Sequence, residues 1–192
     1  DTASPTTEGG TTGELPGEIV ERYPYEGATQ SVVGVEADDT LNVREGPGTD
    51  YAVVVELDPR STEAVATGHN RQLADGATWA ELTVGGDTGW ANVAYLAEAG
   101  ETRDITGEVR VSPEGSSPAD IAVDVAGQRA PDEPAPRVTV VHESQGLGVA
   151  DLLGVGDDSV RGERITVTVE GGTVTVESTV LCSRGVSGGL CV

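Results

Sequence analysis

Few residues of the chain could carry out catalysis, and those few do not match a known catalytic pattern. His142, Glu143 and Ser144 are consecutive, so an imidazole, a carboxylate and a hydroxyl follow one another. Consecutive residues of a strand point to opposite faces, so these side chains cannot form a nucleophile–base pair directly. Ser144 also lies outside the G-x-S-x-G pattern that presents a nucleophilic serine. The sequence therefore predicts no catalytic residues and no enzyme activity.

The acidic pair Asp157-Asp158 and the isolated His69 offer little to a metal ion. A calcium loop needs oxygen ligands at alternate positions, as in D-x-D-x-D-G, and this sequence lacks that pattern. We interpret the acidic pair as a solvated turn and His69 as a surface residue. No metal and no cofactor are predicted.

The only two cysteines, Cys182 and Cys191, close a short glycine-rich loop. An oxidising compartment would join such a pair in a disulfide. A metal site would need four ligands, and only His69 and His142 remain to complete it. A redox dithiol usually has C-x-x-C spacing at the start of a helix. The spacing therefore favours a structural disulfide, which in turn indicates export to the cell envelope or the extracellular space.

Acidic side chains dominate the composition. There are 33 Asp and Glu residues against 11 basic residues, all of them arginine, and the formal net charge is −22. Such a chain repels phosphate, which argues against nucleic-acid binding and a polybasic membrane-surface mode. No apolar run approaches the roughly 20 residues of a membrane helix, so no membrane-spanning segment is predicted. Residues 1–30 are rich in Thr, Gly and Pro and predict a flexible linker. This stretch is typical of an exported protein after signal-peptide removal, and an arbitrarily chosen boundary would look the same.

Short β-branched segments with alternating polarity fill residues 31–100 and predict a small antiparallel barrel. Turn residues separate them, as in Gly46-Pro47-Gly48 and Gly85-Gly86-Asp87. The expected strands are Val32–Val35, Leu41–Arg44, Tyr51–Leu57, Glu63–Thr67 and Thr78–Val84.

Four motif blocks follow one another along residues 31–97. Leu41–Thr49 reads L-N-V-R-E-G-P-G-T, and the aromatic Tyr51 comes next. Trp79 stands in its own expected strand, and Gly89–Leu96 reads G-W-A-N-V-A-Y-L. These blocks resemble the bacterial SH3-like (SH3b) domain family, whose hallmark is L-N-V-R-x-G-P-G-T and whose closing pattern is G-W-x-x-x-x-Y-L.

The chain departs from the family's pattern in two places. Arg60-Ser61 stands where the family usually has a glycine, and the expected loop Gly68–Ala77 is longer than is common. Both departures lie outside the four blocks.

The resemblance implies a binding module. Such domains in exported bacterial proteins commonly bind peptidoglycan, usually through its peptide stems or cross-bridges, and others are structural spacers. A peptide would lie in a shallow groove between aromatic and turn residues, and the candidate binding residues are Asn42, Tyr51, Trp90 and Tyr95. Packing or capping within the barrel explains each of these residues equally well. For Trp79, packing in the core is the expected role.

Residues 101–192 carry no motif that places them securely, and their texture predicts a second β-rich domain. Gly171-Gly172 lies between two alternating runs and is the clearest hairpin signal of the chain. Gly148–Leu153 is the only stretch expected to form a short helix. The ending L-C-S-R-G-V-S-G-G-L-C-V resembles, over a short stretch, exported actinobacterial proteins of unknown function. The expected strands are Ile105–Val111, Asp120–Val125, Arg137–His142, Arg164–Val169 and Thr173–Val180.

Together these patterns predict an all-β protein with a linker over residues 1–30, an SH3-like barrel over 31–100 and a β-rich domain over 101–192. The expected function is that of a non-enzymatic, exported cell-envelope protein whose SH3b module binds peptidoglycan or another peptide. Two alternatives stay open. The SH3b unit could target an enzyme resembling a wall hydrolase, with its active site in the C-terminal half, or it could be a structural spacer.

Overall fold

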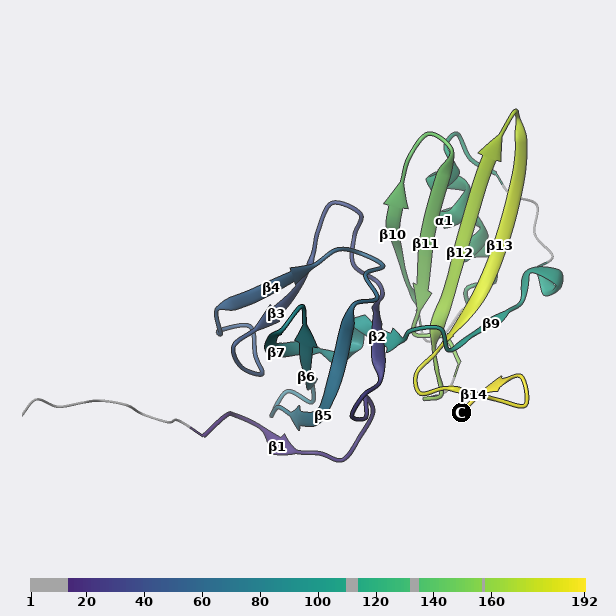
Figure 1. Ribbon diagram of the computed structural model, residues 1–192. Helices are drawn as coiled ribbons and strands as arrows, with labels where there is room; N and C mark the ends of the chain where they lie inside the picture. Colours follow the sequence, from purple (N-terminus) through teal and green to yellow (C-terminus); the bar gives the residue numbers. More distant parts are fainter. Residues whose placement is uncertain (1–13, 110–113, 132–134, 157) are drawn as a thin grey trace, which may run out of the picture.

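The computed structural model describes residues 14–109, 114–131, 135–156 and 158–192. Two antiparallel sheets lie side by side, and an α-helix covers one face of the second sheet (Figure 1). The fold class is all-β, as predicted, and this helix is the only α-helix in the described ranges. No helix in these ranges is long and apolar enough to cross a membrane.

The first sheet has eight short strands and curls into a half-barrel. Its strand order is β4-β3-β7-β6-β5-β2-β8, and β1 pairs with β5. A 3-10 helix, η1 (Val93–Tyr95), leads into β8, which returns to pair with β2. The strands are β1 (Glu18–Ile19), β2 (Thr29–Val32), β3 (Leu41–Arg44), β4 (Val53–Leu57), β5 (Ala64–Gln72), β6 (Thr78–Val84), β7 (Asp87–Asn92) and β8 (Leu96–Glu98).

The first sheet encloses an aliphatic core on one face. Paired residues of antiparallel strands share a face, so Ala80 of β6 and Ala91 of β7 point to the same side, together with Leu82. They join buried valines and leucines of the other strands. Trp79 and Trp90 are also buried, each 4% exposed, but the strand alternation places them on the opposite face. The predicted burial of Trp79 is confirmed, whereas the interior of the half-barrel is filled by Val, Leu and Ala.

Part of the segment predicted as a linker packs against the first sheet. Residues 1–13 lie outside the described residues. From residue 14 onward the chain follows the sheet, and β1 pairs with β5. Tyr23 is buried, and its hydroxyl donates to Gln30 Oε1 at 2.9 Å. A buried tyrosine with a satisfied hydroxyl anchors this segment, which composition alone could not indicate.

The predicted loop Gly68–Ala77 is in part a strand. Strand β5 continues to Gln72 and contains a bulge between Ala66 and Asn70. A bulge accommodates extra residues without ending the strand. His69 therefore lies on a strand, and only the turn before β6 remains as a loop.

The second sheet has the strand order β10-β11-β12-β13-β9, with every pair antiparallel. Helix α1 (Pro118–Arg129) packs on the face formed by β10, β11 and β12. A 3-10 helix, η2 (Thr106–Glu108), follows β9, and a two-stranded ribbon of β14 and β15 lies near the C-terminal end. The strands are β9 (Thr102–Asp104), β10 (Arg137–Glu143), β11 (Leu147–Leu153), β12 (Val160–Glu170), β13 (Thr173–Cys182), β14 (Val186–Ser187) and β15 (Leu190–Cys191).

The segment Asp120–Val125 was predicted as a strand and is instead part of α1. Ser117 caps the helix, because its hydroxyl accepts a hydrogen bond from the backbone N–H of Asp120 at 3.1 Å. Pro118 occupies the first turn, where its missing N–H costs nothing. Over the six residues Asp120–Val125 the apolar side chains alternate as in a strand. The spacing of three and four residues that is typical of a helix is visible only over the full length of α1. The side chains buried on this helix are Pro118, Ala119, Ile121, Ala122, Val125 and Ala126.

The predicted helix Gly148–Leu153 is also wrong, because it is strand β11. Ala150 and Leu152 face α1, while Asp151 and Leu153 face the first sheet. A strand that is covered on both faces loses the apolar–polar alternation by which strands are predicted.

The other predictions for the second sheet are mostly confirmed. Strands β10, β12 and β13 contain the three predicted segments that begin at Arg137, Arg164 and Thr173. Gly171 and Gly172 form the hairpin turn with φ angles of 57° and 83°, which glycine adopts without strain.

The predicted strand Ile105–Val111 is wrong over the part that the structure describes. Strand β9 ends at Asp104, and η2 follows it. Residues 110 and 111 lie outside the described residues.

Cys182 and Cys191 form the predicted disulfide, with Cα atoms 5.2 Å apart. The bond ties β15 to the end of β13. Two further contacts hold this C-terminal loop. The backbone N–H of Val186 donates to Glu101 Oε2 at 2.9 Å, and Arg184 Nε donates to the carbonyl of Val192 at 3.2 Å.

A buried ion pair joins the two sheets. Asp151 on β11 is completely buried, and Arg164 on β12 donates to its two carboxylate oxygens at 2.7 and 2.8 Å. The same carboxylate accepts the backbone N–H of Gly34 at 2.8 Å, and Arg164 also donates to the carbonyl of Val32 at 3.1 Å. Both residues of the pair therefore reach across to the first sheet.

Apolar and backbone contacts complete this junction. The backbone N–H of Ala37 donates to the carbonyl of Val140 at 3.0 Å, so the loop after β2 contacts the outer edge of β10. An apolar cluster shared by the two sheets contains Val33, Ala97, Leu153 and Leu181.

Candidate functional site

A groove beside β3 contains two of the four residues that the sequence predicts to bind a ligand. Its volume is about 490 Å³. The walls are the loop after β2, strand β3, the start of β6, the helix η1 and strand β10 of the second sheet. Asn42 and Tyr95 both line it. We call it the β3 groove.

Two polar groups of the β3 groove lack hydrogen-bond partners. The side-chain amide of Asn42 is half-buried and has no partner among the described residues. Trp79 is buried in the groove wall, and none of the described residues accepts a hydrogen bond from its indole N–H. An unsatisfied buried donor costs about 1–3 kcal/mol, and a ligand carbonyl would recover that free energy where a small shift of the groove wall uncovers the indole N–H.

The remaining walls of the β3 groove carry one aromatic ring and charges of both signs. The guanidinium carbon of Arg137 lies 5.0 Å from the ring centroid of Tyr95, a cation–π distance that holds the ring in place. Glu36 and Asp39 contribute carboxylates, and Arg44 contributes a second guanidinium. A flat ring, an unpaired amide and balanced charges suit a peptide better than a purely anionic ligand.

The other two predicted binding residues lie outside the β3 groove. Tyr51 packs over the turn after β3, because a Cβ added to Gly46 would lie 2.5 Å from two of its ring carbons. Its carbonyl accepts a hydrogen bond from Arg44 at 2.8 Å. Trp90 is buried in β7. The fold thus brings Asn42 and Tyr95 together and separates Tyr51 and Trp90 from them.

Apart from His69 and the two cysteines, the described residues with catalytic or metal-binding side chains that the sequence singled out lie at the end of β10 and in the turn before β12. His142 lies on β10, and Ser144 uses its hydroxyl to donate to the carbonyl of Leu147 at 3.2 Å. Asp158 is exposed, and Asp157 lies outside the described residues. Across the described ranges, no group of three or more His, Cys, Asp or Glu side chains is placed to hold a metal ion.

A hydrogen-bonded cluster on β5 and β6 was not predicted. His69 is exposed, as expected, but its Nδ1 lies 2.7 Å from Glu81 Oε2. The hydroxyl of Thr67 donates to the same oxygen at 2.7 Å. Thr67 Oγ1 also lies 3.5 Å from His69 Nδ1, a long contact beside the 2.7 Å hydrogen bond that commits its proton to the carboxylate. The hydroxyl is therefore not aligned to pass its proton to the imidazole, as the nucleophile of a hydrolytic triad must. Only the bulged register of β5 places these residues beside Glu81, so sequence spacing gave no signal.

A larger cavity of about 1040 Å³ lies between the two sheets and was not predicted either. Arg22, Arg137, Arg161 and Arg184 line it. These arginines are widely separated in the sequence, and only the packing of the two sheets brings them together. We call it the arginine cavity.

Comparisons of this chain with protein families, curated proteins and solved structures found no match.

Proposed function

We propose that this protein is a non-enzymatic, exported cell-envelope protein whose first sheet is an SH3b-like module. It binds a peptide in the β3 groove, and the ligand we favour is the peptide stem or cross-bridge of peptidoglycan. The observation that carries this proposal is the pair of unpaired polar groups, the Asn42 amide and the Trp79 indole N–H, in one groove with the ring of Tyr95.

The positions of the motif blocks in the first sheet support the proposal. Leu41–Arg44 forms β3, which lines the groove, and the Gly-Pro-Gly turn lies between β3 and β4. Trp90 belongs to β7, and Tyr95-Leu96 marks the passage from η1 to β8. A small, curled antiparallel sheet is the architecture that the SH3b resemblance implies. The sequence blocks and the curvature of the sheet therefore agree.

The disulfide supports the export part of the proposal. Disulfides form and persist in secreted and envelope proteins and are rare in reducing compartments. The bond between Cys182 and Cys191 closes the C-terminal loop of the second sheet, where it acts as a structural link.

The balance of charges in the groove predicts how the ligand is held. With a net charge of −22, the whole protein gains little from attraction to anionic wall polymers. Stacking on Tyr95 and hydrogen bonds to Asn42 and Trp79 must provide the binding free energy. We therefore expect binding to persist when the salt concentration is raised, unlike a phosphate-driven interaction.

The test is sedimentation of the full chain with purified insoluble peptidoglycan from a Gram-positive wall. We expect saturable binding at low and at high salt. Asn42→Ala and Tyr95→Ala should each weaken it by about 1–2 kcal/mol, the usual scale for an interface side chain. Tyr51→Ala is the matched control, because Tyr51 lies outside the groove. Circular dichroism of each variant checks that it is folded.

The outcomes separate the competing functions. A larger loss of binding in Tyr51→Ala than in Tyr95→Ala would move the binding surface from the groove to the turn after β3. If the folded protein does not bind peptidoglycan, the proposal is wrong and the structural-spacer alternative is favoured. Release of soluble wall fragments during the incubation would favour the hydrolase alternative.

A further inference from the structure

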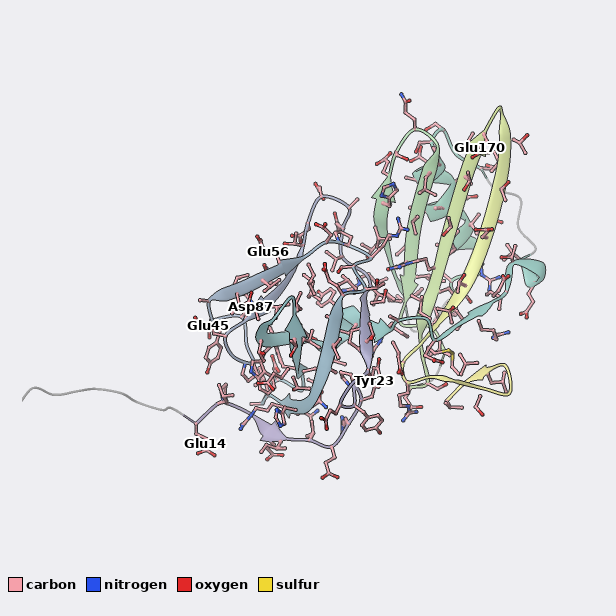
Figure 2. All side chains as sticks on the ribbon, viewed as in Figure 1. Glu14, Tyr23, Glu45, Glu56, Asp87 and Glu170 are labelled. Atoms are coloured by element: carbon pink, nitrogen blue, oxygen red, sulfur yellow. A yellow bond between two sulfur atoms is a disulfide. The ribbon has the colours of Figure 1, made fainter. Side chains whose placement is uncertain are left out.

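The arginines of this acidic protein are unevenly distributed. Acidic side chains are spread over both sheets, from Glu45, Glu56 and Asp87 on the first sheet to Glu170 at the far tip of the second (Figure 2). In contrast, four of the 11 basic residues line one cavity, the arginine cavity. A net positive wall in a chain of charge −22 needs a physical explanation.

Arginines elsewhere in the described chain are mostly used for structure. Outside the arginine cavity, Arg60 is the only described arginine with no hydrogen bond or ion pair from its side chain. The others donate to backbone carbonyls or to carboxylates. They are Arg44, Arg71, Arg103, Arg129 and Arg164.

The arginines of the cavity are poorly neutralised by comparison. Among the described residues, Arg22 and Arg161 have no hydrogen-bond or ion-pair partner for their side chains. Arg184 donates from Nε to the carbonyl oxygen of Val192 at 3.2 Å, and the nearest side-chain carboxylate lies 3.6 Å away on Asp158, whose side chain is 89% exposed. Arg137 stacks on the ring of Tyr95 and meets no carboxylate in the described part of the chain.

Arg161 carries the largest desolvation penalty of the four. Its Nε is buried without an acceptor in the described structure, and burial lowers the pKa of its guanidinium. The nearby Tyr23 does not neutralise it. Burial raises the pKa of this phenol well above its usual range, and the hydroxyl donates to Gln30. A partly buried charge without a counter-ion is costly, and a bound anion would remove that cost.

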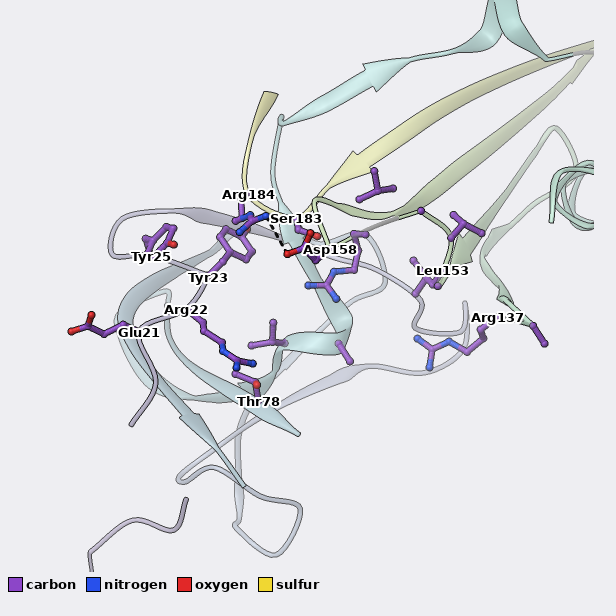
Figure 3. A pocket seen from close by; sticks show the side chains of 18 residues that line it. Glu21, Arg22, Tyr23, Tyr25, Thr78, Arg137, Leu153, Asp158, Ser183 and Arg184 are labelled. Carbon is purple, nitrogen blue, oxygen red and sulfur yellow. Dashed lines mark ion pairs between the residues drawn. The ribbon is translucent and has the colours of Figure 1, made fainter. Parts of the chain in front are cut away.

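The segment before β2 adds an aromatic ring to the cavity wall. Its arginine points into the cavity, and its neighbouring carboxylate points away (Figure 3). Tyr25 is 57% exposed and packs edge-on against Tyr23, with ring centroids 6.2 Å apart. Figure 3 shows Arg22 directed towards Thr78, while the carboxylate of the adjacent Glu21 points the other way. The cavity wall therefore combines guanidinium groups with an exposed ring that can contact the body of a ligand.

We propose that the arginine cavity binds a small organic anion with two or more carboxylate or phosphate groups, held chiefly by Arg161 and Arg22. The guanidinium fork matches both kinds of anion through paired hydrogen bonds, so the shared chemistry is a multivalent anion. The volume of about 1040 Å³ accommodates such a molecule between the two sheets. The cavity shares Arg137 with the β3 groove, but Arg22 and Arg161 line the cavity alone. The proposed anion site therefore does not depend on peptide binding in the groove.

The test is isothermal titration calorimetry of the full chain at constant ionic strength. One arm uses citrate as the tricarboxylate and the other uses pyrophosphate as the phosphate, with the neutral sugar glucose as the blank. We expect saturable binding in at least one anion arm and none with glucose. Binding in only one arm assigns the anion class, and binding in both assigns a general multivalent-anion site. The proposal is overturned if neither anion saturates in the millimolar range.

Three substitutions with the same change in net charge identify the binding groups. Arg161→Gln and Arg22→Gln should each weaken anion binding at least tenfold, because each removes charge-assisted hydrogen bonds. Arg103→Gln is the matched control. Arg103 pairs with Glu108 outside the cavity, so binding should change less than twofold.

The stability of the free variants excludes a purely structural role. Without anion, Arg161→Gln should melt at or above the temperature of the parent protein, because an unpaired buried charge is removed. Arg22 is exposed, so Arg22→Gln gives a reading that does not depend on folding. Equal weakening in all three variants would overturn the assignment of the cavity as the anion site, as would undiminished binding in both cavity variants.

Discussion

The two sheets of this protein bury their apolar surface in different ways. The first sheet curls around an aliphatic core and covers itself, so its strands alternate between buried and half-buried positions. The second sheet relies on α1 to cover one face and on the first sheet to cover part of the other. The first sheet thus buries its apolar face by curving, and the second sheet buries its faces by packing against other elements. The second sheet therefore depends more on contacts between distant segments.

The first prediction tests how far the two sheets depend on each other. Asp151→Ala leaves Arg164 partly buried without its counter-ion, and we expect a loss of about 3–5 kcal/mol in the free energy of unfolding. Urea denaturation should be followed by tryptophan fluorescence, which reports the first sheet because Trp79 and Trp90 both lie there, and by circular dichroism, which reports the whole chain. We expect the two transitions to coincide in the parent protein and to separate in the variant.

Glu163→Ala is the matched control for this prediction. Glu163 forms a similar two-point ion pair with Arg129, but that pair joins α1 to β12 within the second unit and is partly exposed. Its removal should cost less and should leave the two transitions coincident, because the Asp151–Arg164 pair is kept. An Asp151→Ala variant as stable as the parent would show that the ion pair does not couple the sheets.

The second prediction concerns the contact between α1 and its sheet. A Cβ added to Gly148 would lie 2.2 Å from the backbone carbon of Pro118, so the helix must move away from β11. We expect Gly148→Ala to cost about 1–3 kcal/mol, the usual range for overpacking. Gly146→Ala is the control, since its Cβ would meet only the carbonyl oxygen of Val169 at 3.5 Å. Thermal melts followed at 222 nm compare the two variants, and equal melting temperatures would contradict the close approach.

The third and smallest effect is expected at the start of α1. Ser117→Ala removes the capping hydroxyl and should cost about 1 kcal/mol, while Ser117→Asp keeps a capping oxygen and should stay close to the parent. Both variants are measured by the same thermal melts. A Ser117→Ala variant that melts at the temperature of the parent would contradict the capping role of Ser117.

The contrast between the sheets also explains which elements could be predicted from sequence. Leu41–Arg44 and Thr78–Val84 match β3 and β6, because a sheet with one covered face keeps a period of two. The same rule failed for β11, whose two faces are both covered. It failed again for α1, where a short alternating run lay within a capped helix.

The candidate site was only partly accessible to sequence reasoning. Asn42 and Tyr95 were found through motif blocks, and both line the β3 groove. The role of Trp79 in the groove wall was missed. The sequence predicted that Trp79 packs in the core, and no sequence pattern indicates that its indole N–H lacks an acceptor. The arginine cavity could not be predicted, since its walls come from segments that meet only where the two sheets pack.

The contact between Ala37 and Val140 has a consequence for aggregation. Strand β10 is an edge strand of seven residues, R-V-T-V-V-H-E, rich in β-branched side chains. An uncovered edge of this kind offers free N–H and C=O groups to strands of other molecules. The backbone N–H of Ala37 occupies the carbonyl of Val140 on that edge, so the loop after β2 obstructs pairing at the middle of β10. A fragment made of the second sheet alone would expose β10 and should self-associate. Contact with the first sheet therefore helps to keep the second sheet soluble.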